Sequence, residues 1–288
     1  MEVLDPPTAD AARALWSRAG EADGVAAVSE AFALAVGRER PGVVHLLRFD
    51  EGDLVGYGQV ADAGTDDAAA ELVVDPQHRR RGHGRALLDA ALGAGARSVW
   101  AHGDLPSARA LATSAGMEAS RSLHLMGRSL TPADAVDPEL PEGYSVRAFE
   151  PGRDEETWVR LNAAAFASHP EQGRMTVADL RERMEQPWFD AAGFLVVERD
   201  GRMVAFHWTK VEPESTSAGE VYVVGVDPAE QGHGLGGPLT GLGLAHLARA
   251  GLAEVHLYVD GDNTAARRTY ARLGFEDLAV DVQYSPGA

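Results

Sequence analysis

One motif occurs twice in this sequence. Residues 74–84 read VDPxxRxxGxG and residues 226–236 read VDPxxQxxGxG, without a gap and 152 residues apart. Further along, AGME at residues 115–118 matches LGFE at residues 273–276, now 158 residues apart. A repeat of this length has the size of a domain, whereas solenoid repeats span about 20 to 50 residues. The sequence therefore predicts two copies of one domain, which suits a chain of 288 residues.

The boundary between the copies is predicted from composition. Residues 131–142 contain three prolines and four acidic residues, without the periodicity of a helix or a strand. Such a stretch is typical of an exposed linker between domains. We therefore expect an N-terminal domain at residues 1–130, a linker at 131–142 and a C-terminal domain at 143–288.

The hydrophobic pattern predicts strands and helices that alternate in both copies. In the second copy we expect strands at 144–149, 193–199, 203–211, 220–226 and 255–259, helices at 154–167, 177–185, 235–250 and 264–273, and a closing strand. In the first copy we expect strands at 43–49, 54–60, 71–74 and 99–102, and helices at 83–97 and 107–115. The predicted fold class is therefore α/β, with a mixed α+β sheet flanked by helices.

Composition excludes several classes of function. The formal net charge is −18 and the one run of basic residues is Arg79-Arg80-Arg81, so we expect no nucleic-acid binding. The chain has no cysteine, and its ten histidines lack the spacing of metal ligands, so we expect no metal. No stretch approaches the ~18 to 20 apolar residues of a membrane span, and the first residues lack the pattern of a signal peptide. We therefore expect a cytoplasmic protein that does not enter a membrane.

The repeated glycines lie between a predicted strand and a predicted helix. A helix N-terminus offers unpaired N–H groups and a positive dipole end, and glycines allow an anion to approach the backbone closely. The motif therefore suits a phosphate or pyrophosphate, although isolated G-x-G sequences often serve only tight packing. A Walker A loop is excluded because no lysine is nearby, and a Rossmann fingerprint would follow the first strand of its unit rather than the third.

The second copy resembles the GNAT N-acetyltransferase family. The resemblance rests on the glycine motif, on DNTAARRTY at residues 262–270 and on LGFE at residues 273–276, and it extends to the first copy. It implies two tandem GNAT (acyl-CoA N-acyltransferase) domains that use acetyl-CoA as cosubstrate. In the second domain the resemblance assigns acetyl-CoA binding to Val224, Gly225, Val226, Gln231, Gly232, His233, Gly234, Leu235, Gly236, Gly237, Asn263, Thr264, Ala265, Ala266, Arg267 and Arg268. In the first domain, where occupancy by a cofactor stays open, the corresponding residues are Leu72, Val73, Val74, Arg80, Arg81, Gly82, His83, Gly84 and Arg85.

Two further residues of the second copy suit an acyl transfer. The attacking amine must lose a proton and the departing thiolate gains one, so a base and an acid are useful on opposite sides of the carbonyl. The resemblance implies Glu220 as the base and Tyr270 as the acid, although a surface carboxylate and a core aromatic are the alternative interpretations. At the matching offsets the first copy has Ala68 and Ala112. We therefore expect the first domain to be non-catalytic.

A closer resemblance, to the mycothiol synthase family of tandem GNAT enzymes, extends over nearly the whole chain. It rests on HPEQG at residues 169–173, HWTKV at 207–211, LYVDGDN at 257–263 and WAHG at 100–103. It implies acetylation of the cysteinyl amine of desacetylmycothiol, a cysteinyl-glucosaminyl-inositol, to give mycothiol and CoA. The resemblance assigns substrate binding to Glu30, Glu171, Lys210, Glu220 and Tyr258. Among these, Lys210 is the only lysine of the chain, and an accident on a strand surface is the alternative interpretation.

Two other functions stay open at this point. The first is acetyl transfer to another amine, such as an aminoglycoside or a protein N-terminus, which the match outside the cofactor loop disfavours. The second is a non-catalytic CoA-binding regulator, which the presence of Glu220, Asn263 and Tyr270 in one copy disfavours. The preferred interpretation is a monomeric enzyme with a small-molecule amine as substrate.

Overall fold

The computed structural model describes residues 3–167 and 170–287. The chain forms two compact units, the first containing residues 1–123 and 279–288 and the second containing residues 124–278. This division differs from the predicted boundaries at 130 and 143, because the end of the last strand pairs with a strand of the first unit. Residues 131–142, the predicted linker, fall within the second unit. Domains at 1–130 and 143–288 remain a prediction about the copies of the sequence.

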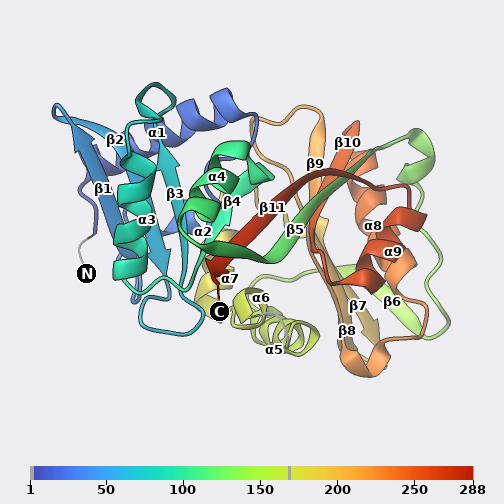
Figure 1. Ribbon diagram of the computed structural model, residues 1–288. Coiled ribbons are helices and arrows are strands. Elements are labelled where there is room, and N and C mark those ends of the chain that lie inside the picture. The colour runs from blue at the N-terminus through green and yellow to red at the C-terminus, as the bar shows by residue number, and fades with distance from the viewer. Residues whose placement is uncertain (1–2, 168–169, 288) are drawn as a thin grey trace. The chain divides into compact units, whose positions relative to one another are not determined.

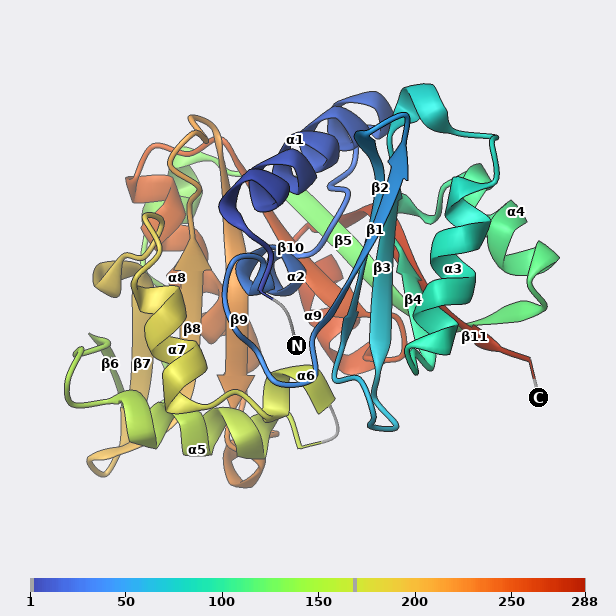
Figure 2. The same ribbon diagram turned by 90° about the vertical axis from the view of Figure 1, so that its left-hand side faces the viewer.

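The first unit is a sheet covered by helices on both faces. Strands β1, β2 and β3 pair antiparallel, β3 pairs parallel with β4, and the C-terminal part of β11 pairs antiparallel with β4. Helix α1 packs on one face, while α3 and α4 pack on the other (Figure 2). The elements are α1 (Pro6–Asp23), α2 (Glu30–Ala35), β1 (Val44–Asp50), β2 (Asp53–Ala61), β3 (Ala69–Val74), η1 (Pro76–His78), α3 (His83–Gly93), β4 (Ser98–Ala101), η2 (His102–Asp104), α4 (Pro106–Ser114) and β5 (Met117–Ser129), which continues into the second unit.

Helix α1 was not among the predicted elements, although its ends carry clear signals. The side chain of Asp5 accepts a hydrogen bond from the Thr8 N–H at 2.9 Å, and proline occupies the first helical position. The helix ends at Gly24, which has φ +71°. An acidic N-cap residue before proline is a common start signal of a helix, and a glycine with left-handed φ after the last turn is a common stop signal.

The second unit repeats this architecture. Strands β6, β7, β8 and β9 pair antiparallel in sequence order, and β9 pairs parallel with β10. Helices α5 and α7 pack on one face and α8 and α9 on the other (Figure 1). The elements are η3 (Pro132–Ala135), β6 (Tyr144–Ala148), α5 (Glu155–Ala165), α6 (Pro170–Gly173), α7 (Val177–Met184), η4 (Ala191–Gly193), β7 (Phe194–Arg199), β8 (Arg202–Lys210), β9 (Ala218–Val226), η5 (Pro228–Glu230), α8 (Gly236–Arg249), β10 (Glu254–Asp260), α9 (Thr264–Arg272) and β11 (Glu276–Pro286), which ends in the first unit.

An aromatic cluster forms the core between β7–β9 and the helices α5 and α7. The Trp208 ring stacks on Phe194 with centroids 4.4 Å apart and meets Trp158 edge-on at 5.9 Å. All three side chains are fully buried. Stacked and edge-on pairs add about 0.5 to 1.5 kcal/mol each to the burial of aromatic area. This cluster fixes β8 and β9, on which several candidate site residues lie.

The predicted α/β class is confirmed. The helix predicted at 83–97 ends earlier, at Gly93, because the chain turns through Gly95 with φ +96°. Over the residues that the structure describes, no helix is long and apolar enough to cross a membrane.

Candidate active site

Strand β9 contains a β-bulge at Tyr222. Trp208 pairs with Val223 and Thr209 pairs with Val221, so Tyr222 has no partner in the register with β8. Both Tyr222 and Val223 pack against the aromatic cluster, whereas strict alternation would place them on opposite faces. A bulge bends its strand and interrupts the ladder. It therefore changes the course of β9 in the segment that leads to the glycine loop.

The parallel pairing of β9 with β10 stops beside this bulge. Register pairs run from Ala218–Glu254 to Val221–Leu257, although β9 continues to Val226 and β10 to Asp260. Beyond Val221 the β10-facing edge of β9 is thus outside the ladder. The N–H groups of a strand edge outside a ladder can donate to a bound carbonyl oxygen.

The glycine loop of the second unit has the geometry of an anion site. Gly232 and Gly234 adopt φ of +84° and +80°, and residues 231–234 are exposed. The loop leads into α8, whose first turn carries no acidic residue. The first N–H groups of a helix lack intrahelical partners and lie at the positive end of the dipole. The loop can therefore receive a phosphate group without a basic side chain.

A polar network that the sequence did not reveal supports this loop. The Glu230 carboxylate accepts hydrogen bonds from the Tyr144 hydroxyl at 2.5 Å and from the Arg199 guanidinium at 3.0 Å, and it lies 3.4 Å from His233 Nδ1. The hydrogen bond from Tyr144, followed by Arg199, holds the pKa of Glu230 below its ordinary value. The network links β6, β7 and η5 and neutralises a carboxylate close to the expected phosphate.

Tyr270 lies in α9, beside the loop and β9. The position of a Cβ on Gly236 would be 3.9 Å from the Thr269 methyl group, so the start of α8 adjoins α9. The Tyr270 side chain is 7% exposed and belongs to the same core cluster as Val221. Val224 packs against this cluster. Burial raises the pKa of Tyr270 to about 12, so the phenol keeps its proton at neutral pH. A protonated phenol is what a general acid requires.

Glu220 lies on the opposite face of the sheet from Tyr270. Val221 packs in the cluster that contains Tyr270, and adjacent residues of a strand point to opposite faces. Glu220 Oε2 is 3.7 Å from His256 Nε2, and Glu220 and Lys210 are register partners on β9 and β8. Thus the expected acid and base lie on the two sides of the same strand.

Lys210 is buried and surrounded by aromatic rings. Its Nζ lies 4.9 Å from the centroid of Trp188 and 5.4 Å from that of Tyr222, and it forms an ion pair with Glu212 at 2.6 Å. Such a position fixes the ammonium group by cation–π attraction. Lys210 therefore does not lie on an exposed surface.

The remaining expected residues are distributed as follows. Asn263 caps α9, since its Oδ1 accepts from the Ala266 N–H at 3.1 Å, and Arg267 pairs with Asp277 at 2.9 Å. Tyr258 is 46% exposed on β10. Glu30 begins α2 of the first unit. The side chain of Glu171 lies outside the described residues. Thr264, Ala265 and Arg268 are exposed on α9.

The first unit keeps the loop but not the bulge. Arg80 and Gly82 adopt φ of +65° and +87° before α3, whereas β2 and β3 pair regularly from Gly56–Val74 to Ala61–Ala69. Because only β9 carries an extra residue, Glu220 corresponds structurally to Ala69, which corrects the Ala68 obtained from the constant offset. Alanine stands at this place in either alignment.

Several basic side chains near the first loop are already paired. Arg79 forms a bidentate ion pair with Asp23 at 2.6 and 2.7 Å, and Arg85 pairs with Asp89 at 2.8 Å. His83 is buried and accepts from the Arg48 guanidinium at 3.3 Å. Arg80 and Arg81 of the loop are exposed, and Arg81 lies 3.8 Å from Asp50, so their guanidinium groups are donors beside the loop backbone.

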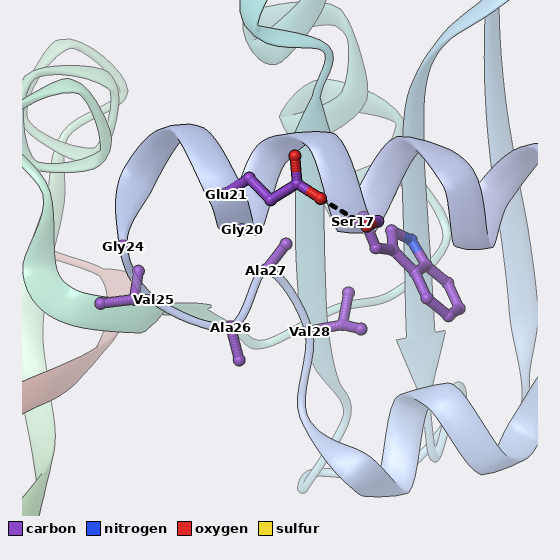
Figure 3. A pocket seen from close by; sticks show the side chains of 9 residues that line it. Ser17, Gly20, Glu21, Gly24, Val25, Ala26, Ala27 and Val28 are labelled. Carbon is purple, nitrogen blue, oxygen red and sulfur yellow. Dashed lines mark hydrogen bonds between the residues drawn. The ribbon is translucent and has the colours of Figure 1, made fainter. Parts of the chain in front are cut away.

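A shallow pocket of about 470 Å³ lies elsewhere on the first unit (Figure 3). Helix α1 and the segment after it line the pocket, through Trp16, Ser17, Gly20, Glu21 and residues 24–28. None of the candidate residues is among them, so the site rests on the strand and loop geometry rather than on this pocket. Within the described ranges, no group of three or more His, Asp or Glu residues suits a metal ion.

Comparisons with known families agree with this geometry. The model of the acetyltransferase (GNAT) family matches residues 158–275, and that of an acetyltransferase (GNAT) domain matches residues 41–116. Among solved structures, a tandem GNAT protein from the clavulanic acid biosynthesis pathway superposes with a TM-score of 0.75 at 20% identity, over 100% of this chain and 98% of that one. A GCN5-related N-acetyltransferase from Sphaerobacter thermophilus gives a TM-score of 0.70 at 23% identity, over 100% and 96%. These likenesses confirm the tandem GNAT fold.

Curated relatives match the chain along its whole length. A mycothiol acetyltransferase of Streptomyces griseus is 50% identical, over 99% of this chain and 94% of that protein. A mycothiol acetyltransferase of Thermobispora bispora is 51% identical, over 99% of this chain and 98% of that protein. The closer resemblance seen in the sequence is thereby confirmed. The chain belongs to the mycothiol acetyltransferase family and consists of two GNAT domains in tandem.

Proposed function

We propose that this protein is an acetyl-CoA-dependent N-acetyltransferase that acetylates the cysteinyl amine of desacetylmycothiol to give mycothiol and CoA. The observation that carries the proposal is the identity of about 50% to mycothiol acetyltransferases over 99% of the chain. The interrupted β9–β10 ladder beside an open glycine loop supports acyl-CoA as the donor. The second domain performs the chemistry, and the first is non-catalytic.

Acetyl-CoA binds in the second domain with its pyrophosphate at residues 231–237 and its thioester along β9. The N–H groups of the loop and of the start of α8 surround the phosphates. Residues 224–226 lie on β9 beyond Val221, where the pairing with β10 has ended. Their N–H groups polarise the thioester carbonyl and stabilise the negative oxygen that develops during attack.

The transfer proceeds directly between the two substrates. Glu220 takes a proton from the substrate amine, directly or through water, and the amine nitrogen attacks the thioester carbonyl carbon. The tetrahedral intermediate then collapses, the C–S bond breaks, and the Tyr270 phenol protonates the departing CoA thiolate. No covalent enzyme intermediate forms, because the chain has no cysteine and the reaction needs no protein nucleophile.

The amine substrate is held by carboxylates, a lysine and a tyrosine. Glu30, Glu171, Lys210 and Tyr258 bind the pseudo-disaccharide through its hydroxyl groups, alongside the base Glu220. Lys210 supports this role because aromatic rings hold its ammonium in one place, as a donor to sugar oxygens requires. Carboxylates suit a substrate rich in hydroxyl groups and carrying an amine.

The direct test is an acetylation assay. The purified protein is incubated with acetyl-CoA and desacetylmycothiol, release of the CoA thiol is followed, and the mass of the product is determined. We expect selective acetylation of the cysteinyl amine, and no comparable turnover of a generic amine or an aminoglycoside. Binding of acetyl-CoA without turnover of desacetylmycothiol would contradict the proposal.

A further inference from the structure

One histidine lies next to the proposed base and has no part in the mechanism above. His256 on β10 and Glu220 on β9 are register partners, with His256 Nε2 3.7 Å from Glu220 Oε2. The His256 side chain is 35% exposed, whereas that of Glu220 is 17% exposed. The pair therefore connects a mostly buried carboxylate to a ring that reaches solvent.

The neighbouring groups favour His256 over other partners of Glu220. Lys210, the register partner on the other side, directs its ammonium to Glu212 at 2.6 Å. In the described part of the chain, His256 is the one basic side chain in contact with the Glu220 carboxylate. Residues 255, 257 and 259 are buried on the α8 and α9 face, so His256 and Tyr258 share the other face of β10 with Glu220.

The proposed reaction includes a proton-release step in which such a partner can take part. Each turnover transfers one proton from the amine to Glu220, and the carboxylate must lose it before the next turnover. A 17% exposed carboxylate exchanges protons with bulk water through few contacts. An imidazole accepts a proton on one ring nitrogen and releases one from the other, and so conducts it with no net change in charge. Exchange of the ring protons with water then restores the starting tautomer.

On the basis of the proposed function, we infer that His256 is a positioning residue that also carries the proton from Glu220 to solvent. The proton passes from the protonated Glu220 carboxyl to His256 Nε2, and the Nδ1 proton then leaves to water, so the base is regenerated. At 3.7 Å the two atoms are beyond hydrogen-bond distance. The proton passes through a bridging water, or the two side chains move closer together when substrate binds, since catalytic contacts often tighten in the complex.

The test compares His256→Ala and His256→Gln with the wild-type enzyme, with and without added imidazole. Single-turnover and steady-state rates are measured with acetyl-CoA and desacetylmycothiol, so that slow product release does not hide the effect. We expect kcat to fall about tenfold or more in both variants, with little change in KM, because general acid–base steps contribute at least this much. Imidazole should restore much of the rate of His256→Ala, since it can occupy the vacated space and carry the proton.

His246→Ala is the matched control. His246 also forms a histidine–carboxylate pair, with Asp190 at 3.3 Å, but it lies at the end of α8. We expect its kcat to equal that of the wild type and to be independent of imidazole.

The outcomes separate the inference from the proposed function. If the wild type does not acetylate desacetylmycothiol, both fall. If the wild type is active and His256→Ala keeps its full rate, or if imidazole has no effect, the relay alone is overturned. If His256→Gln regains the full rate, His256 only holds Glu220 in place and carries no proton. A thermal unfolding curve and acetyl-CoA binding for each variant show that a loss of rate is not a loss of fold.

Discussion

At the scale of single residues, the assignment with the clearest consequence is Tyr270. Tyr270 is 7% exposed, and burial raises its pKa to about 12, so the phenol stays protonated across the neutral range. Tyr270→Phe removes the proton and keeps the ring. We expect kcat to fall by about 10² or more, the usual contribution of a general acid. Acetyl-CoA binding and the unfolding temperature should change little.

The matched control for this substitution is Tyr284→Phe. Tyr284 also loses a hydroxyl, which donates to Asp104 at 2.7 Å in the first unit. Its turnover should stay at the wild-type level. Isothermal titration of acetyl-CoA and single-turnover rates provide the measurement. An unchanged rate for Tyr270→Phe would show that water, not Tyr270, protonates the thiolate.

The resemblance of the sequence to its family gives these roles as predictions, but it does not give the contacts around the residues. Glycines, an acid on a strand and a tyrosine on a helix are visible in a sequence because the motif is local. The network of Glu230 with Tyr144 and Arg199 joins residues up to 86 positions apart, so no local sequence pattern predicts it. The β-bulge at Tyr222 was also invisible, since it depends on how β8 pairs with β9.

At the scale of elements, the contact between α8 and β8 tolerates no added methyl group. A Cβ on Gly243 would lie 2.0 Å from His207 Nε2, and His207 is fully buried with its Nδ1 hydrogen-bonded to the Leu239 carbonyl at 2.9 Å. Gly243→Ala therefore forces α8 away from the sheet. We expect unfolding at clearly lower denaturant concentration, with a loss of about 1 to 3 kcal/mol or more, as overpacked cores show.

Gly93→Ala is the control for Gly243→Ala, because it adds the same methyl group to a glycine of another helix. Gly93 lies in α3, and a Cβ there would meet nothing within 4 Å. The added methyl group should leave stability unchanged or raise it slightly, because alanine favours helix over glycine. Equal denaturation midpoints for the two variants would contradict the close packing at His207.

A second element-scale feature ties β11 to β3 and η2 in the first unit. His102 Nδ1 lies 3.0 Å from Asp281 Oδ2 and Nε2 lies 3.3 Å from Glu71 Oε2, the latter without the alignment of a hydrogen bond. Desolvation alone would lower the His102 pKa, but the hydrogen bond with Asp281 and the charges of Glu71 and Asp281 prevail and raise it to about 10. The buried imidazolium is thus an internal counter-ion for two carboxylates.

This arrangement makes stability depend on pH in a defined direction. Because the folded pKa is raised, the stabilisation is complete below the unfolded value of 6.5 and is lost as the pH rises towards about 10. The free energy of unfolding should therefore decrease by roughly a few kcal/mol across this window. His102→Gln should be less stable at pH 6 and show a flatter profile. A wild-type stability that is constant between pH 6.5 and 10 would contradict the assignment.

At the scale of the whole molecule, the duplicated sequence predicted two units of one fold. Both units have a sheet covered by helices, and a glycine turn precedes α3 in the first unit and α8 in the second. The duplication did not predict how the chain is divided between them. The last ten residues, 279–288, belong to the first unit although they follow the second copy of the motif. A local pattern identifies a strand, but which partner the strand finds depends on contacts far apart in sequence.

Removal of residues 279–288 therefore tests the division of the chain. The deletion takes away one of the two partner strands of β4 and the Asp281 carboxylate beside His102. It also removes the hydrogen bonds of Gln283 with Ser98 and of Tyr284 with Asp104. The His102 imidazolium then keeps only Glu71 of its two carboxylates, and the Gly103 N–H loses its acceptor, Asp281 Oδ1. Hydrogen exchange should accelerate in β3 and β4 of the first unit, while β7 and β8 of the second unit keep their protection. Deletion of Ala288 alone is the control and should leave both units protected. Faster exchange in the second unit with a protected first unit would show that the C-terminal strand stabilises the copy it follows in sequence.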